Sequence, residues 1–351
     1  MRLLIICQKV DEGDDVLGFF VYWIRALAQR VESVKVIALE KGGFDLPQNV
    51  EVISLGKEMS YSKFDQALRF YWFAFKFLLK SDGVFVHMAP EYVRALYPLN
   101  LIFRKPIVMW YAHIKVSPVA KWAIKHVNFV CTPSKESFLH DSDKVIATGH
   151  GINTELFTPM SVPIQGDVLS LGRISKVKRI EVLIKALKIL KHDLNSSTVA
   201  NIYGAPARPE DDAYLSHLRD LEHQWGLAET VHWKGPVSNL EAPQVYAAHR
   251  IFVRMQGEGG FGKVELEAMS MGIPAIVPTN IYENELAEWH DDLYYPEDDA
   301  HELAKKIERV LNWSDEHRDA YAKRAREVVV RRHNIEHVAE TVVKLLESCV
   351  A

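Results

Sequence analysis

Residues 167–205 read DVLSLGRISKVKRIEVLIKALKILKHDLNSSTVANIYGA, and this stretch decides the fold class. Residues 167–174 and 199–205 are short runs rich in apolar side chains, as is typical of buried strands. Between them, residues 182–193 carry apolar side chains at helical spacing. The stretch therefore predicts two parallel strands joined by a crossover helix, and parallel sheets are covered by helices on both faces.

The same alternation continues on both sides of this unit. We expect further strands at residues 3–7, 34–39, 84–88, 106–111, 129–132, 144–149, 229–235, 250–256 and 274–280. We expect helices at residues 23–31, 64–80, 117–127, 214–226, 242–249 and 263–272, and an amphipathic tail helix at 333–350. The pattern restarts after the polar stretch from Phe157 to Gly166, which predicts a linker between two α/β domains. Ligands of such sheets bind at the carboxyl ends of strands, so we expect the function in the cleft between the domains.

The composition is that of an ordinary globular protein, with 351 residues of which 48% are hydrophobic and 25% charged. Cys7, Cys131 and Cys349 lie far apart, which argues against a disulfide framework or a zinc site and suits a reducing cytosol. The first apolar run is too short for a signal peptide, and no run reaches the ~18 residues that cross a bilayer. These features predict a cytoplasmic protein.

The charge is unevenly distributed. The formal net charge of -4 does not point to nucleic acid as a partner. From Lys57 to Lys135, however, there are 12 Lys and Arg residues against four Asp and Glu. Within this region, residues 64–80 are aromatic and apolar around much of the expected helix. A buried helix is the favoured interpretation, and a helix lying on an acidic membrane is the alternative.

Three glycines, Gly257, Gly259 and Gly262, spell the dinucleotide fingerprint GxGxxG. The motif lies late in the chain, and the following strand ends in Pro-Thr-Asn with no acidic residue to hold a ribose. We therefore reject a dinucleotide site. The glycines still allow a close approach of the backbone to a ligand, and the helix that follows favours an anion at its start. A phosphate near residues 260–263 fits this arrangement, and so does a plain tight turn.

Basic residues follow the strand at 167–174. Arg173 follows its core DVLSL at 167–171, and Lys178 opens the next helix region five residues after Arg173, so both side chains can reach a diphosphate at this sheet edge. Solvated basic residues at a helix start would look the same.

The helix at 263–272 carries two carboxylates, Glu265 and Glu267, on different sides. We expect Glu267 to face a ligand, where it could accept ribose hydroxyls, and Glu265 to be an exposed charge.

His113 follows the strand at 106–111, and His87 and Glu91 follow the strand at 84–88. Each could contact a sugar or transfer a proton. A capping or core position explains His113 equally well and is the favoured interpretation for His87 and Glu91.

Four stretches in this order resemble the retaining family 4 glycosyltransferases of the GT-B fold. They are KVIATGHGINTELFTP at 144–159, GRISKVKRIEVLIKALKIL at 172–190, ETVHWKGPVSN at 229–239 followed by VYAAHRIFV at 245–253, and GGFGKVELEAMSMGIPAIVPT at 259–279. The resemblance implies two Rossmann-like domains facing a cleft. Residues 1–158 would form the acceptor side, residues 159–332 would bind the nucleotide-sugar, and residues 333–351 would cross back onto the first domain.

The resemblance also implies roles for individual residues. Arg173 and Lys178 would hold the donor diphosphate, His113 would touch the donor sugar, and Glu267 would bind the ribose. The other implied donor-binding residues are Gly172, Val237, Glu258, Gly259, Gly260, Phe261, Gly262 and Lys263. The loop at 11–18 would form the facing wall of the cleft, and the acceptor-side candidates are Gly13, Asp14, Asp15, His87 and Glu91.

One position departs from the family pattern. The family usually has two glutamates with seven residues between them, and the second is Glu267. The first falls on Gly259, while Glu258 stands one position earlier. Either Glu258 serves instead, or the backbone and other side chains hold the sugar.

The resemblance implies a retaining, metal-independent glycosyltransferase that uses a UDP- or GDP-sugar and no cofactor. The acceptor would be a glycan or a lipid-linked sugar, with possible contact of the first domain with the inner face of the membrane. Two alternatives remain, namely a nucleotide-sugar-binding subunit without activity and a sugar-nucleotide epimerase of the same fold.

Overall fold

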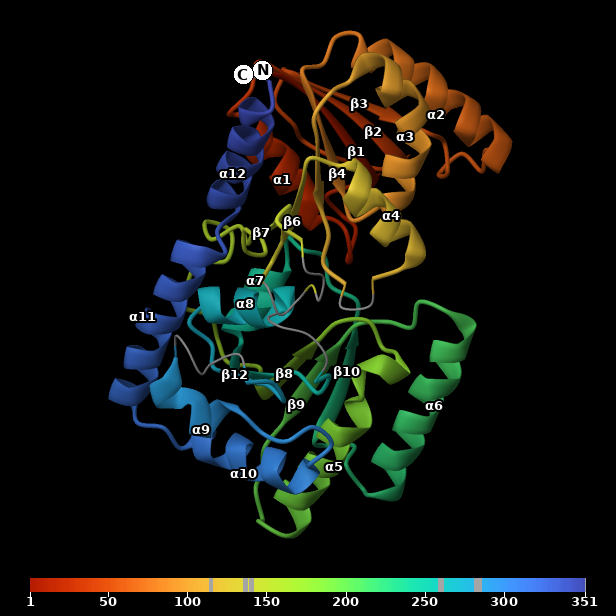
Figure 1. The fold of residues 1–351 in the computed structure, drawn as a ribbon. Coiled ribbons are helices and arrows are strands. Elements are labelled where there is room, and N and C mark those ends of the chain that lie inside the picture. The colour runs from red at the N-terminus through yellow and green to blue at the C-terminus, as the bar shows by residue number, and fades with distance from the viewer. Residues whose placement is uncertain (114–115, 135–137, 139–141, 258–261, 281–285, 351) are drawn as a thin grey trace. The chain divides into compact units, whose positions relative to one another are not determined.

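The computed structural model describes residues 1–113, 116–134, 138, 142–257, 262–280 and 286–350. The chain forms two compact units. Unit 1 comprises Met1–Asn153, Ser238–Leu240 and Arg332–Ala351, and unit 2 comprises Thr154–Val237 and Glu241–Arg331. Each unit is an α/β fold built on one parallel sheet (Figure 1).

The sheet of unit 1 has seven parallel strands in the order β3-β2-β1-β4-β5-β6-β7. Its strands are β1 Arg2–Val10, β2 Ser33–Lys41, β3 Val50–Ser54, β4 Gly83–His87, β5 Ile107–Trp110, β6 Phe129–Thr132 and β7 Val145–Ala147. β1 is a central strand that pairs with β2 on one side and β4 on the other, so that Ile5 of β1 lies opposite Val36 of β2 and Phe85 of β4. The central strands are buried on both faces, as expected for a parallel sheet.

Helices cover both faces of this sheet (Figure 1). They are α1 Phe19–Ala28, α2 Lys63–Leu78, α3 Pro90–Phe103, α4 Pro118–His126 and α12 Ile335–Ser348. Leu4 and Ile6 point to the face packed by α2, α3 and α4, where they join one hydrophobic core. On the other face α12 packs against α1 and reaches β4 and β5, so the end of the chain completes the core of unit 1.

The sheet of unit 2 has five parallel strands in the order β10-β9-β8-β11-β12. Its strands are β8 Gly166–Leu171, β9 Ala200–Tyr203, β10 Val231–Gly235, β11 His249–Val253 and β12 Ala275–Ile276. Its helices are η1 Lys176–Lys178, α5 Ile180–His192, α6 Pro209–Gln224, α7 Ala242–Ala247, α8 Lys263–Ser270, η2 Ala287–Trp289, α9 His290–Leu293, α10 Ala300–Leu311 and α11 Asp315–Arg332. From β8 the chain first adds strands on one side of the sheet (β9, β10) and then on the other side (β11, β12). The connections that follow β8 and β11 therefore leave in opposite directions. Such sheets bind ligands at this point, at the carboxyl ends of the two strands.

Two elements of unit 1 differ from the sequence expectation. The sequence pattern predicted neither β3 nor α3. β3 is a half-exposed edge strand whose second residue is Glu51, which weakens its apolar signal. α3 contains Pro98, a residue that usually ends a helix.

The favoured interpretation of residues 64–80 as a helix buried between the sheet and its neighbours holds for one side of α2 only. Phe70, Ala74, Phe77 and Leu78 are buried against the sheet, but the opposite side is open to solvent. Among the described residues, no helix is long and apolar enough to cross a membrane.

Candidate functional site in unit 2

The ends of β8 and β11 bring two arginines to one sheet edge. Leu169 of β8 pairs with Phe252 of β11, so the two strands finish at the same level. Arg254 follows β11 directly, and Arg173 follows β8 after Gly172. Sequence reasoning missed Arg254. Its signal was similar to that of Arg173, a basic residue at the end of an apolar run.

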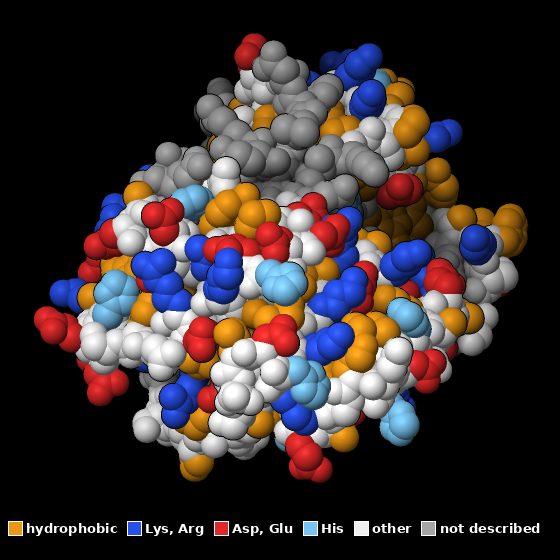
Figure 2. All heavy atoms as spheres, turned by 90° about the horizontal axis from the view of Figure 1, so that it is seen from below, with side chains coloured by type: hydrophobic (Ala, Val, Ile, Leu, Met, Phe, Trp, Pro, Cys, Tyr) orange, Lys and Arg blue, Asp and Glu red, His pale blue; other side chains and the backbone are white. Residues whose placement is uncertain are grey.

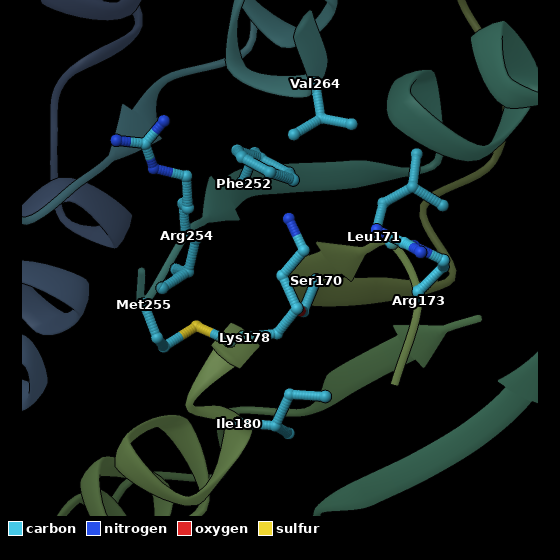
Figure 3. Close-up of a pocket in the computed structure, with 11 residues that line it drawn as sticks. Ser170, Leu171, Arg173, Lys178, Ile180, Phe252, Arg254, Met255 and Val264 are labelled. Carbon is cyan, nitrogen blue, oxygen red and sulfur yellow. The ribbon is translucent and has the colours of Figure 1, made fainter. Parts of the chain in front are cut away.

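Lys178 joins these arginines in a hollow of unit 2 (Figure 3). The hollow is lined by the ends of β8 and β11, by Lys178 and Ile180, and by Val264 of α8. The Lys178 amine points into it, with Arg254 and Arg173 on either side. Burial lowers the pKa of Lys178, the Glu265 carboxylate raises it, and the charges of Arg254 and Arg173 lower it further. The hollow is thus a cationic site that favours an anion.

Glu265 is fully buried, so the expectation that it would be an exposed charge is wrong. Its carboxylate pairs with the Arg254 guanidinium and also accepts a hydrogen bond from the backbone N–H of Gly262, which precedes α8. The other side of Arg254 lies 3.3 Å from the Thr279 hydroxyl. This buried pair ties the end of β11 to the start of α8.

Glu267 is also buried, on another side of α8. Its Oε1 lies 2.9 Å from Nζ of Lys263, and its Oε2 lies 3.1 Å from the hydroxyl of Tyr246 on α7. Burial raises the pKa of Tyr246, and the neighbouring Glu267 charge adds to this. Lys263 is the first residue of α8, so this contact lies at the start of the helix, where sequence reasoning placed donor-binding backbone.

Glycines form the backbone at the ends of three adjacent strands. Gly172, Gly204 and Gly235 follow or end β8, β9 and β10, and all three have positive φ. The N–H of Gly172 donates to Tyr203, and the N–H of Gly204 donates to Gly235. A Cβ on Gly204 would lie 1.9 Å from the carbonyl oxygen of Gly172, so this close approach requires glycine. The row holds the turn that carries Arg173.

A second hollow of about 310 Å³ lies next to β10. It is lined by Pro236 and Val237, by Tyr203, and by α7 residues that include Gln244. Val237 thus lies at a concave surface of unit 2.

Four expected donor-binding residues, Glu258, Gly259, Gly260 and Phe261, lie outside the described residues. Their described neighbours are held on both sides. The N–H of Gly257 donates to Glu297 (2.9 Å), and Gly262 is held by Glu265.

The acidic loop of unit 1 is held by its own hydrogen bonds and ion pairs. The Asp14 carboxylate accepts from the N–H groups of Val16 and Leu17 and pairs with Lys9 at 2.7 Å. Burial alone would raise the pKa of Asp14, but the contacts with Lys9, Leu17 and Val16 outweigh it, and the pKa is lowered. Gly13 and Asp15 are exposed. Asp14 therefore has a structural task, while Asp15 is open to solvent.

The remaining candidates in unit 1 differ in exposure. His87, at the end of β4, is buried and stacked between the rings of Phe20 (4.1 Å) and Trp110 (5.4 Å). This position corrects the expectation that His87 would contact an acceptor directly and favours the core interpretation. Glu91 is exposed in the first turn of α3. His113 is exposed after β5, with its ring 5.2 Å from that of Tyr111.

Residues 164–328, almost all of unit 2, match the family described as glycosyl transferases group 1. Unit 2 is therefore similar to the group 1 glycosyl transferases, in line with the sequence resemblance.

Curated relatives of the same kind match part of the chain. A D-inositol 3-phosphate glycosyltransferase of Streptomyces scabiei is 27% identical over 155 residues, which cover 39% of this chain and 33% of that protein. A GDP-mannose-dependent alpha-(1-6)-phosphatidylinositol monomannoside mannosyltransferase of Mycobacterium tuberculosis is 31% identical over 116 residues, which cover 31% of this chain and 28% of that protein. The matches span about a third of the length of these curated relatives.

Solved structures match nearly the whole chain. A sucrose-phosphate synthase from Thermosynechococcus elongatus superposes with a TM-score of 0.78 at 18% identity and covers 99% of both chains. Anabaena HepE in complex with UDP-glucose gives a TM-score of 0.76 at 18% identity, covering 99% of this chain and 100% of that one. This likeness shows the fold, and it confirms the expected α/β class with two Rossmann-like units of the GT-B type.

Proposed function

We propose that this protein is a retaining, metal-independent glycosyltransferase that takes a sugar from a UDP- or GDP-sugar. One observation carries the proposal. In a group 1 glycosyl transferase unit, Lys178, Arg173 and Arg254 line one hollow at the carboxyl ends of two adjacent strands. Three cations next to one carboxylate, Glu265, leave a positive site whose partner would be the donor diphosphate.

The chemistry asked of these residues is electrostatic. When the bond from the anomeric carbon to the diphosphate breaks, negative charge grows on the leaving phosphate oxygen and positive charge on the sugar. Cations already in place stabilise that oxygen without rearranging, so a divalent ion is not needed for this step. The acceptor hydroxyl then adds to the anomeric carbon on the same face, and its proton goes to the departing phosphate. His113 is proposed to contact the donor sugar.

Glu267 and the second hollow would bind the nucleoside. The Glu267 carboxylate can accept both ribose hydroxyls, in exchange for its present contact with Lys263. The released Lys263 amine would then lie at the start of α8, where the donor phosphate or sugar is expected. The hollow beside Val237 offers a concave surface for the base. Backbone from Gly260 to Gly262 would hold the sugar.

Unit 1 would bind the acceptor. The names of two curated relatives specify inositol phosphate and a phosphatidylinositol mannoside, both anionic acceptors. Residues 57–135 of this chain are rich in Lys and Arg. We propose an anionic glycan or lipid-linked acceptor, no nucleic acid partner, and a location in the cytoplasm at the inner face of the membrane.

Gly259 supports a second candidate. Where the family usually carries its first glutamate, this chain has glycine. A subunit that binds a nucleotide-sugar without transferring it would tolerate this loss, and so would an epimerase that changes the sugar without an acceptor.

Thermal unfolding with a panel of UDP-, GDP- and ADP-sugars tests the donor site. A donor at 100 times its dissociation constant adds about 2.7 kcal/mol to the free energy of unfolding. Lys178→Ala should remove most of this effect and lower turnover by about 100- to 1000-fold. The control is Lys185→Ala, an exposed lysine on α5 that lines neither hollow.

The outcomes separate the candidates. Stabilisation by one donor, with transfer to an acceptor that Lys178→Ala abolishes, supports the transferase. Stabilisation without transfer to any acceptor supports the binding subunit, and an altered sugar without an acceptor supports the epimerase. Stabilisation by none of the donors, or normal turnover in folded Lys178→Ala, contradicts the donor site.

A further inference from the structure

The outer side of α2 is an exposed apolar stripe. Its members are spaced by three or four residues, so they share one side of the helix. They are Phe64, Leu68, Tyr71, Trp72, Phe75 and Leu79. Phe64 is 71% exposed and Trp72 is 67% exposed. The core of unit 1 does not use these side chains, because the opposite side of α2 already packs on the sheet.

The end of α3 extends the stripe. The ring of Phe103 lies 5.5 Å from that of Phe75, which places the two helices side by side at this point. Leu101 and Ile102 precede Phe103 and are open to solvent, Ile102 to 73%. Two helices of one unit thus present a joint surface, defined by the six α2 residues with Leu101 and Ile102 and named here the α2–α3 surface.

Cations without anionic partners border the α2–α3 surface. Lys76 and Lys80 lie on α2 or directly after it, Lys63 lies at its start, and Arg104 ends α3. All four are exposed, and none forms an ion pair with any described residue. Of the acids near the surface, Asp82 pairs with Arg2 at 2.7 Å, while Asp65 accepts from Ser62 and keeps its negative charge, so the four cations outnumber it. The border of the surface is therefore positively charged.

The continuous apolar stripe of the α2–α3 surface differs from the distribution of side chains on the face of the molecule drawn in Figure 2. Figure 2 shows Lys, Arg, Asp and Glu side chains intermixed there, with hydrophobic side chains in small groups. Such scattered apolar residues are normal on a soluble protein, whereas a continuous aromatic stripe marks a contact surface.

We propose that the α2–α3 surface docks on a bilayer that contains anionic lipid. Trp, Tyr and Phe side chains favour the boundary between headgroups and acyl chains, so α2 would lie in the membrane plane with its stripe inserted. Lys63, Lys76, Lys80 and Arg104 would meet the lipid phosphates, which attract juxtamembrane cations. A second copy of the chain fits less well, because a two-fold interface would bring like charges together.

The biological purpose of this docking, which is to bring the transferase to a lipid-borne acceptor, rests on the proposed function. Binding to the bilayer itself needs no donor. It can therefore fail or succeed independently of the donor site.

Sedimentation with vesicles tests the proposal on the full chain. The wild type should bind vesicles with equal parts phosphatidylglycerol and phosphatidylcholine, and bind phosphatidylcholine alone weakly. Trp72→Ser with Phe75→Ser should lower the partition coefficient by about tenfold or more, since two aromatic side chains no longer insert. Lys76→Gln with Lys80→Gln should lower it by about tenfold at low salt and by less at high salt.

Matched controls lie on unit 2. Leu194→Ser removes an exposed apolar residue there, and Lys185→Gln with Lys323→Gln removes two exposed lysines. Neither should change vesicle binding. Quenching by brominated lipid gives a second readout, in which Trp72→Phe should remove the quenched part of the emission from the eight tryptophans.

The outcomes decide the inference. The melting temperature without any donor should be the same in wild type and the α2 variants, which shows that they fold and keeps this test separate from that of the donor site. Absence of wild-type binding to anionic vesicles overturns the proposal, as does equal binding by the α2 variants and the wild type. A chain that ignores vesicles but changes from dimer to monomer on Trp72→Ser would assign the surface to self-association instead.

Discussion

Arg254 and Glu265 form a buried pair in which each residue needs the other. Arg254→Leu leaves the Glu265 carboxylate buried without its cation, so we expect a loss of about 3–5 kcal/mol in the free energy of unfolding. Glu265→Leu should cost a similar amount for the converse reason. The double variant should recover most of the stability, because a buried ion pair can often be replaced by apolar residues.

Donor binding should not recover in the double variant, because the hollow then lacks one of its three cations. Denaturant unfolding and donor titration of the four proteins in the cycle measure the two effects separately. Full donor affinity in the double variant would show that Arg254 only supports the fold.

At the scale of the element, the glycine row fixes the turn that carries Arg173. Gly204→Ala would place a methyl group 1.9 Å from the Gly172 carbonyl oxygen at a φ of +142°. We expect a loss of about 2 kcal/mol or more and weaker donor binding, because the backbone of Gly172 must move.

Gly226→Ala is the matched control for this change. Gly226 also has positive φ, at +62°, but a Cβ there would meet nothing within 4 Å. It should cost about 1 kcal/mol from backbone strain alone and leave donor binding intact. Equal losses in the two variants, measured by thermal unfolding, would mean that the contact between Gly204 and Gly172 is unimportant.

The elements also show what the sequence could predict. The buried central strands and Arg173 were predictable, because apolar runs and the residues that end them are local features. The burial of Glu265 was not. Helical period places Glu265 and Glu267 on different sides of α8, but it cannot tell that both sides are covered, as the structure shows.

α2 gives the opposite case. Aromatic residues occur around most of the helix, and the sequence alone could not tell which of them the sheet would cover. That difference depends on tertiary packing, which also decided that β3 and α3 form despite weak local signals.

At the scale of the whole molecule, the chain leaves unit 2 at Arg331 and enters unit 1 at Arg332. The next residue, His333, is buried, and its carbonyl oxygen accepts from the N–H of Ile152 at 2.6 Å. Gly149 packs closely against the same backbone, where a Cβ would lie 2.9 Å from Cα of His333. The re-entry of the chain into unit 1 is therefore tightly packed around a histidine.

This histidine should make the folded state sensitive to acid. Burial lowers the pKa of His333 from 6.5 to about 3, and the charges of His150 and Arg332 add to this. The native state thus keeps His333 neutral, while the unfolded chain takes up a proton below pH 6.5. The contribution to stability is complete above pH 6.5 and is lost as the pH falls toward 3, by up to about 1.4 kcal/mol per pH unit.

His333→Gln should therefore lower stability at neutral pH through imperfect packing, yet flatten the fall of stability between pH 6.5 and 4. The measurement is denaturant unfolding of both proteins at several pH values, with His301→Gln at an exposed position of α10 as the control. The difference between variant and wild type removes the contribution of carboxylates that titrate in the same range. If only the unfolded chain binds a proton at His333, acid must destabilise the wild type more steeply than the variant. A parallel pH dependence of stability in the two proteins would therefore show that His333 can be protonated in the folded state.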